Sequence, residues 1–294
     1  MNQLRQPNRA DPALPSTLKA LLSRHSIRPR KRLGQHFLIS AEIADRIVEV
    51  ARIDSSDCAL EIGAGAGALT LRLTETASST IAIESDPRLV EVLQEILPSG
   101  EGLKLMQADI LKIDLSKLMG EGTWKVLGNL PYYITGPVLF KLFEQRRSFS
   151  SLVVMVQREV ADRITSSPGS KEYGGLSVLA QAYFLPRAEM RVKRTCFYPQ
   201  PEVDSTVVSL TPRAKAAVGE EDQKQFEKLV RASFSHRRKT LENSLVEAGF
   251  VRNRQEAVSA MEAVGVNAGR RAESLSVEEF VMLARRLKGG DERD

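Results

Sequence analysis

The feature that most constrains the fold is a glycine-rich turn between a predicted strand and a predicted helix. The run 58–62 has the length and apolar character of a buried strand, and Gly63, Gly65 and Gly67 follow it. Glycine allows a tight turn and lets a ligand approach the backbone closely. The spacing nearly matches the turn that binds a dinucleotide at the start of a βαβ unit. The sequence therefore predicts a ligand-binding α/β fold.

Predicted strands and helices alternate along most of the chain. Strands are predicted at 58–62, 80–83, 103–107, 125–128, 151–157, 188–192 and 205–211, and helices at 41–51, 68–76, 87–97, 137–144, 159–164 and 176–182. Such alternation is typical of a parallel sheet with both faces covered. After Pro212 only helical segments follow, at 222–233, 238–247, 254–264 and 277–287. We therefore predict an α/β domain at 33–212 and a small all-helical domain at 213–294.

Acidic residues follow two of the predicted strands. Glu84 stands at the end of the second strand, where a carboxylate accepts hydrogen bonds from ribose hydroxyls. Asp109 follows the third strand, where an acid suits the amino group of adenine, although it could instead cap a helix. With Gly63 and Gly65, these acids indicate a cofactor that contains adenosine. A nicotinamide dinucleotide and S-adenosylmethionine both remain open at this point.

The tetrapeptide Asn129-Leu130-Pro131-Tyr132 after the fourth strand separates these two cofactors. The Asn129 oxygen can accept a hydrogen bond from an exocyclic amine, proline fixes the backbone, and the Tyr132 ring offers a stacking face. The alternative is a turn that ends a strand and buries a tyrosine. A dehydrogenase needs a hydride acceptor site, usually with a proton-transferring His, Lys or Tyr, and this chain has the tetrapeptide 129–132 in that place instead. The pattern favours methylation of a nucleobase amino group, a displacement that depends mostly on positioning. We expect Tyr133 to be structural.

The composition argues against a metal site and a membrane span. The chain has two cysteines, Cys58 and Cys196, without ligand spacing, and three histidines. This usage fits a reducing compartment, and we expect a cytoplasmic protein without metal. No apolar run approaches the roughly 18 residues that a membrane helix requires. The Arg-rich start of the chain also resembles an organellar transit peptide, so an organellar location is the alternative to a cytoplasmic one.

Basic residues gather in two clusters. Residues 1–32 carry eight Lys or Arg and one acidic residue, whereas residues 33–150 carry eleven Lys or Arg and sixteen acidic residues. Such asymmetry fits a polyanionic partner, and we read 1–32 as a basic arm with one short helix near 18–22. The alternative for either cluster is a solvated charged face. The candidate phosphate contacts are Arg30, Lys31, Arg32, Arg237, Arg238 and Lys239.

Taken together, these residues resemble the small-subunit (16S) ribosomal RNA adenine N6,N6-dimethyltransferases. The resemblance covers residues 28–287. Its motifs are Lys31–Leu38, Glu61–Thr70, Glu84–Asp86, Asp109, Asn129–Tyr132, Gln157–Val160, Tyr173–Ser177, Phe197–Ser205, Arg237–Leu241 and Arg271–Ser276. It implies a class I (Rossmann-like) S-adenosylmethionine-dependent methyltransferase domain with a helical C-terminal domain.

The resemblance also assigns residues to roles. The implied S-adenosylmethionine contacts are Gln35, His36, Leu38, Gly63, Gly65, Glu84, Asp109 and Asn129. His36 stands where some members have Asn, so cofactor binding could weaken at low pH. Phe197 is implied to enclose the target adenine opposite Tyr132. On its own, the Phe-x-Pro-x-Pro stretch would indicate structural packing.

The implied reaction adds methyl groups to N6 of two adjacent adenosines in the 3′-terminal hairpin loop of small-subunit rRNA. The expected partners are that rRNA and the assembling 30S subunit, and we expect a monomer. One alternative is the large-subunit rRNA methyltransferase of the macrolide-resistance type, which usually has Ile in place of Leu130 and lacks the stretch 271–276. Another is a non-catalytic, RNA-binding ribosome assembly factor.

Overall fold

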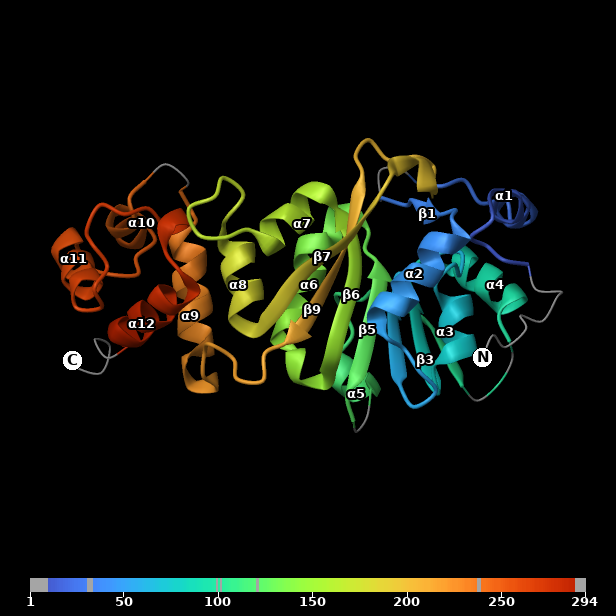
Figure 1. Ribbon diagram of the computed structural model, residues 1–294, viewed down its shortest axis with the longest axis horizontal. Coiled ribbons are helices and arrows are strands. Elements are labelled where there is room, and N and C mark those ends of the chain that lie inside the picture. Colours follow the sequence, from blue (N-terminus) through green and yellow to red (C-terminus); the bar gives the residue numbers. More distant parts are fainter. Residues whose placement is uncertain are drawn as a thin grey trace. The chain divides into compact units, whose positions relative to one another are not determined.

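The computed structural model describes residues 10–30, 34–98, 100, 102–119, 122–236 and 239–288. The chain divides into two units (Figure 1). The first comprises the described residues of Met1–Arg158 and Arg187–Thr211, and the second comprises those of Glu159–Pro186 and Pro212–Asp294. Residues 159–186, which the sequence analysis placed in the α/β domain, thus belong with the helical part of the chain. The chain enters the second unit twice.

The described residues of the chain form a sheet of seven strands in the order β4-β3-β2-β5-β6-β9-β7. The first five strands of this sheet in chain order are parallel: β2 (Cys58–Ile62), β3 (Ser79–Glu84), β4 (Leu103–Gln107), β5 (Trp124–Asn129) and β6 (Phe149–Gln157). Strand β9 (Ser205–Pro212) is antiparallel to β6, and β7 (Phe184–Val192) lies at the edge. This arrangement confirms the predicted α/β class.

The strand order reverses between β2 and β5, because β3 and β4 extend the sheet on one side and β6 on the other. In open α/β sheets, ligands bind beyond the carboxyl ends of the strands at such a switch point. A separate two-stranded ladder pairs β1 (Phe37–Leu38) with β8 (Phe197–Tyr198). The topology therefore indicates that a site lies at the carboxyl ends of β2 and β5.

The helices of the first unit follow from their apolar spacing and caps. They are α1 (Pro15–Arg24), α2 (Ala41–Ala51), α3 (Thr70–Thr76), α4 (Pro87–Ile96), α5 (Leu115–Met119) and α6 (Thr135–Glu144). Helix α2 buries one face at helical spacing, and the Ser40 side chain caps it by accepting from the Ile43 amide. Asp86 caps α4 in the same way, with Pro87 at its first turn.

The segment 10–30, which lies within the predicted basic arm, packs against the rest of the first unit. Leu18 and Leu21 of α1 are buried in a cluster with Leu89 and Leu93 of α4. Apolar contacts of this kind help to hold the segment in place. Residues 1–9 and 31–32 of the predicted arm lie outside the described residues.

The second unit is built from helices around an aromatic core. Its helices are α7 (Arg158–Thr165), α8 (Gly175–Tyr183), α9 (Glu220–Ser233), α10 (Leu241–Glu247), α11 (Arg254–Glu262) and α12 (Val277–Lys288). The Tyr183 ring of α8 lies edge-on to Phe226 of α9, with ring centroids 6.3 Å apart. Phe234 and Phe280 form a second pair at 5.8 Å. No helix within the described ranges is long and apolar enough to cross a membrane.

Arg72→Ala tests how the N-terminal segment is fastened. The Arg72 side chain is buried and donates to Asp11 at 2.9 Å and to Asp45 at 2.5 Å. Its loss leaves both carboxylates without this partner, so we expect the free energy of unfolding to fall by about 3 kcal/mol. Urea unfolding followed by the fluorescence of Trp124, the only tryptophan of the chain, measures it.

Arg46→Ala is the matched control, because its ion pair with Glu49 is on the surface. That variant should lose less than about 1 kcal/mol. Equal losses in the two variants would show that the buried network does not fasten the segment.

Candidate active site

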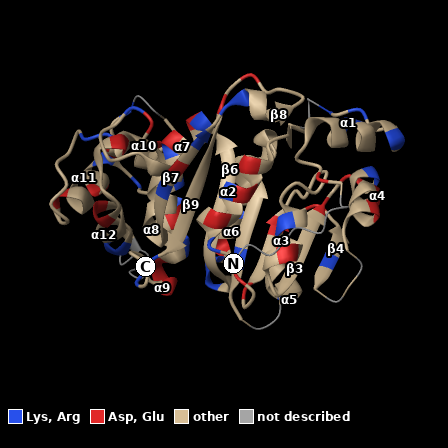
Figure 2. Cartoon of the chain, turned by 45° about the vertical axis from the view of Figure 1, so that its right-hand side comes forward, with Lys and Arg blue, Asp and Glu red and all other residues tan. Residues whose placement is uncertain are grey.

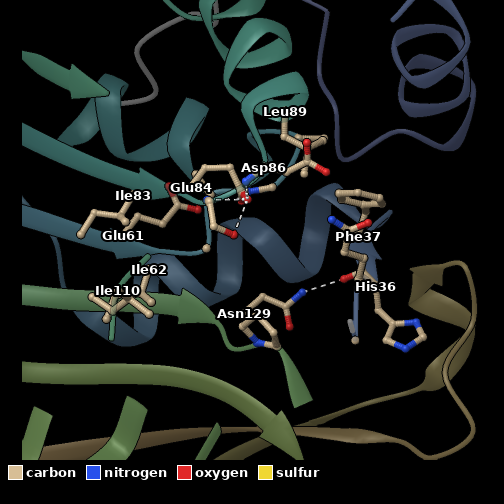
Figure 3. A pocket seen from close by; sticks show the side chains of 18 of the residues that line it. His36, Phe37, Glu61, Ile62, Ile83, Glu84, Asp86, Leu89, Ile110 and Asn129 are labelled. Atoms are coloured by element: carbon tan, nitrogen blue, oxygen red, sulfur yellow. Dashed lines mark hydrogen bonds between the residues drawn. The ribbon is translucent and has the colours of Figure 1, made fainter. Parts of the chain in front are cut away.

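A cavity of about 470 Å³ lies at the switch point of the first unit (Figure 3). Its wall includes the glycine turn after β2, the end of β3, the segment after β4 and the end of β5. Every residue predicted to contact the cofactor lines it, namely Gln35, His36, Leu38, Gly63, Gly65, Glu84, Asp109 and Asn129. Residues that are far apart in the sequence therefore meet in one cavity.

The glycine turn presents bare backbone to this cavity. Gly63 and Gly65 have φ angles of +74° and +58°, in the left-handed region that residues with side chains rarely adopt. A Cβ at Gly65 would lie 3.4 Å from the Phe37 ring. The amides of Gly63 and Ala64 donate to the Ile83 carbonyl at 2.9 and 3.1 Å, which fastens the turn to β3.

Glu84 connects this turn to the start of α4. Its Oε2 accepts from the Gly65 amide at 2.8 Å, and its Oε1 accepts from the amides of Ser85 and Asp86 at 2.8 Å each. Burial raises the pKa of Glu84, and these amide hydrogen bonds oppose that rise. A carboxylate has about four acceptor positions, so Oε2 retains one for a ribose hydroxyl.

Asp109 does not cap a helix, because the next helix, α5, begins only at Leu115. Its Oδ1 accepts from the Leu111 amide at 3.0 Å, as in a local turn. The side chain is nevertheless 42% exposed and lines the cavity, so it can also accept from a ligand.

Glu61 is a cavity residue that the sequence analysis did not select as a site residue. It is 1% exposed and its Oε2 has no hydrogen-bond partner among the described residues. Burial raises the pKa of Glu61 to about 8; the Thr70 hydroxyl opposes the rise and Glu84 adds to it. An acid inside an apolar strand, next to the glycine turn, was the signal that could have found it.

Asn129 is oriented by a hydrogen bond from its amide nitrogen. Nδ2 donates to the His36 carbonyl at 2.8 Å (Figure 3). Because the donor end of the amide is engaged, the acceptor oxygen is the end that remains for a ligand. His36 in turn donates from Nδ1 to the Pro199 carbonyl at 2.6 Å.

The rest of the tetrapeptide has a defined backbone. The Leu130 amide donates to Met155 O at 3.1 Å, while the Pro131 carbonyl accepts from the Ile134 amide and the Thr135 hydroxyl, both at 3.1 Å. No donor within the described part of the chain reaches the Leu130 carbonyl. That carbonyl is the backbone acceptor that follows Asn129 in the sequence.

The two aromatic residues of this segment differ in their surroundings. The Tyr132 hydroxyl lies 2.7 Å from Ser205 Oγ, and its ring centroid lies 5.3 Å from that of His36. Asn129 and Pro131 line the cavity, whereas Leu130 and Tyr132 lie outside its wall. Tyr133, expected to be structural, is 55% exposed and lines the cavity.

Phe197 is placed differently from the expectation. Its side chain is 2% exposed and belongs to a core cluster with Leu127 and Met155. The pairing of Phe197 with Leu38 in the short β1–β8 ladder holds it there. The structure therefore does not support the predicted contact between Phe197 and a base.

The basic candidates are only partly described. Arg30 lines the cavity, whereas Lys31, Arg32, Arg237 and Arg238 lie outside the described residues. In the second unit, Lys239 pairs with Glu247 and lines another cavity of about 420 Å³ with Arg163 and Arg271. Figure 2 shows acidic and basic residues interspersed on the helices of this unit.

The chain matches the model of the ribosomal RNA adenine dimethylase family over residues 27–288. It belongs to this family. The ribosomal RNA small subunit methyltransferase A of Pelotomaculum thermopropionicum is 42% identical over 282 residues, which are 92% of this chain and 96% of that protein. The protein of the same name from Bacillus mycoides is 41% identical, with coverage of 94% and 97%.

Two solved structures are similar over most of the chain. A dimethyladenosine transferase from Plasmodium falciparum has a TM-score of 0.73 at 27% identity, covering 87% of this chain and 98% of that one. The 23S rRNA methyltransferase ErmE has a TM-score of 0.65 at 25% identity, covering 86% and 99%. The predicted class I methyltransferase fold and its cofactor, S-adenosylmethionine, are thereby confirmed.

The residues of the cavity fit this cofactor. The glycine turn leaves room for a ligand against the backbone, and Glu84 and Asp109 offer acceptors for a ribose and for an adenine amine. The unpartnered, buried Oε2 of Glu61 offers a further polar contact. Within the described ranges, no group of three or more His, Cys, Asp or Glu could hold a metal ion.

Glu61→Gln is expected to flatten the dependence of stability on pH in the cofactor-free protein. The pKa of Glu61 is about 8 in the native state and 4.5 in the reference state. The native state therefore holds a proton that the unfolded chain loses, and stability falls as pH rises from 4.5 to 8. Between pH 5.5 and pH 8, the variant should lose less stability than the wild type by an amount on the order of 3 kcal/mol.

Urea unfolding at both pH values, followed by Trp124 fluorescence, measures this difference. Glu49→Gln, which alters an exposed carboxyl group, is the control and should behave as the wild type. A pH dependence in Glu61→Gln equal to that of the wild type would contradict the assignment.

Proposed function

We propose that this protein transfers methyl groups from S-adenosylmethionine to N6 of two adjacent adenosines in the 3′-terminal hairpin loop of small-subunit rRNA. The product is N6,N6-dimethyladenosine, formed while the 30S subunit assembles. The observation that carries the proposal is the Asn129 amide at the cavity, whose nitrogen is engaged by His36 and whose oxygen is left to accept. The family match and the names of the relatives support the substrate.

The proposed mechanism uses two acceptors and no strong base. The lone pair of an adenine amine is delocalised into the ring, and hydrogen bonds from its N–H groups to Asn129 Oδ1 and to the Leu130 carbonyl draw it back to nitrogen. When bound, S-adenosylmethionine would supply the methyl group from its sulfonium sulfur and leave as S-adenosylhomocysteine, and N6 would release one proton to solvent at each transfer. The chain then has to hold the amine in line with that group, and such positioning can account for a large part of a rate enhancement.

The proposed site suits an unpaired base. RNA-binding proteins usually read bases in loops, where the cost of unstacking is small. Tyr132 stands three residues beyond Asn129 and offers a ring against which the target adenine can stack. Pro131 lies between them and fixes the turn of the backbone.

The proposed RNA contacts lie in both units. Arg30 stands at the cavity in the first unit, with Lys31 and Arg32 next to it in the sequence. In the second unit, Lys239 shares a cavity with Arg163 and Arg271, and Arg237 and Arg238 precede it in the sequence. Contacts to phosphate would orient the RNA without reading its sequence. We further propose that the protein acts as a monomer in the cytoplasm.

The test is methyl transfer from labelled S-adenosylmethionine to unmethylated 30S subunits and, in parallel, to 50S subunits. The expected product is dimethyladenosine in the 30S rRNA, identified by mass spectrometry of its nucleosides. Labelling of 50S alone would assign the macrolide-resistance type of reaction instead. Cofactor binding without any transfer would favour a ribosome assembly factor.

In the same assay, Asn129→Ala should lower the transfer rate to 30S subunits by about 100-fold or more, because the oriented acceptor is lost. Cofactor affinity, measured by calorimetry, should fall much less, since the other predicted cofactor contacts remain. Transfer by Asn129→Ala at the wild-type rate would remove this residue from the mechanism.

A further inference from the structure

The ring of Tyr132 is held at its hydroxyl end by a buried serine. The Tyr132 hydroxyl lies 2.7 Å from Ser205 Oγ, and Ser205 is fully buried at the start of β9. Ser205 pairs with Gln157 of β6, so the sheet fixes the position of its hydroxyl. The ring is thus tied to a strand of the central sheet.

The same ring meets a second fixed group. The His36 and Tyr132 ring centroids are 5.3 Å apart, with an angle of 31° between the ring planes. The His36 ring is itself held, because its Nδ1–H donates to the Pro199 carbonyl at 2.6 Å. Tyr132 therefore has one contact at its hydroxyl and another at its ring.

Both contacts depend on the segment from Pro199 to Ser205, because Pro199 accepts from the His36 ring and Ser205 bonds to the Tyr132 hydroxyl. Asp204 fastens this loop, since its carbonyl accepts from the Arg158 amide at 3.1 Å and its Oδ1 accepts from the Arg194 amide at 2.9 Å. A loop anchored in this way can hold the ring at a constant angle.

We propose that Ser205 is a positioning residue for methyl transfer: its hydrogen bond to the Tyr132 hydroxyl sets the plane against which the target base lies. The inference rests on the proposed function, in which adenine stacks on Tyr132. In-line displacement is sensitive to small displacements of the reacting atoms. A ring that tilts would tilt the stacked base and move N6 away from Asn129 Oδ1.

Burial raises the pKa of Tyr132, so its hydroxyl keeps its proton at neutral pH. The hydrogen bond to Ser205 therefore does not depend on an ionised tyrosine. Either oxygen can donate in this pair, and replacing either residue removes the same bond.

The test is a double-mutant cycle with Ser205→Ala and Tyr132→Phe. Each change removes one hydroxyl and leaves the Tyr132 ring in place. Each single variant should lower the single-turnover rate on 30S subunits by about 3- to 10-fold, as expected for one net hydrogen bond. The double variant should lose no more than either single variant, because both changes remove one shared interaction.

Ser209→Ala is the matched control on the same strand, since its hydroxyl bonds to Glu189 instead. This variant should transfer at the wild-type rate. Calorimetry should give Ser205→Ala a cofactor dissociation constant equal to that of the wild type, which separates positioning from a general disturbance of the cavity.

Wild-type transfer by Ser205→Ala would overturn the inference. So would losses that add in the double variant, or a weakening of cofactor binding as large as the loss in rate. If the wild-type protein itself transferred nothing to 30S subunits, the proposed function would fail first. The wild-type sample reveals that outcome independently of the variants.

Discussion

The hydrogen bond from Asn129 Nδ2 to the His36 carbonyl is the constraint on which the rest of the site depends. An amide can present either a donor or an acceptor, and this bond decides which. With its nitrogen engaged, Asn129 offers oxygen, which suits an amine. In the reverse orientation two sets of donors would face each other and the adenine amine would be repelled. The contact also joins the end of β5 to the segment before β1.

The fold brings Asn129 together with the glycine turn and Glu84. The carboxyl ends of parallel strands lie on the same side of the sheet. The glycine turn, Glu84 and Asn129 therefore share a cavity, although other elements separate them in the sequence. Glu84 then binds the Gly65 amide and holds the turn against β3. Asn129 and Pro131 thus line the same cavity as the glycine turn and Glu84, an arrangement that suits a reaction dependent on positioning.

The residues at the carboxyl ends of the strands were largely predictable from the sequence, because short apolar runs indicate where buried strands end. The contacts in the structure group residues 159–186 with the helical part of the chain. The sequence could not indicate this, since an amphipathic helix shows that it buries a face but not against which partner. The burial of Phe197 depends on the β1–β8 ladder, which is too short to produce a periodic pattern. The raised pKa of Glu61 depends on burial in three dimensions, which a single strand cannot reveal.

The most direct test of the Asn129 orientation is a crystal structure of the protein with S-adenosylhomocysteine and adenosine. The adenine N6 should lie within about 3.2 Å of both Asn129 Oδ1 and the Leu130 carbonyl, with Asn129 Nδ2 still on the His36 carbonyl. A base bound at the cavity with N6 remote from both oxygens, or with the Asn129 side chain turned away from His36, would contradict the account.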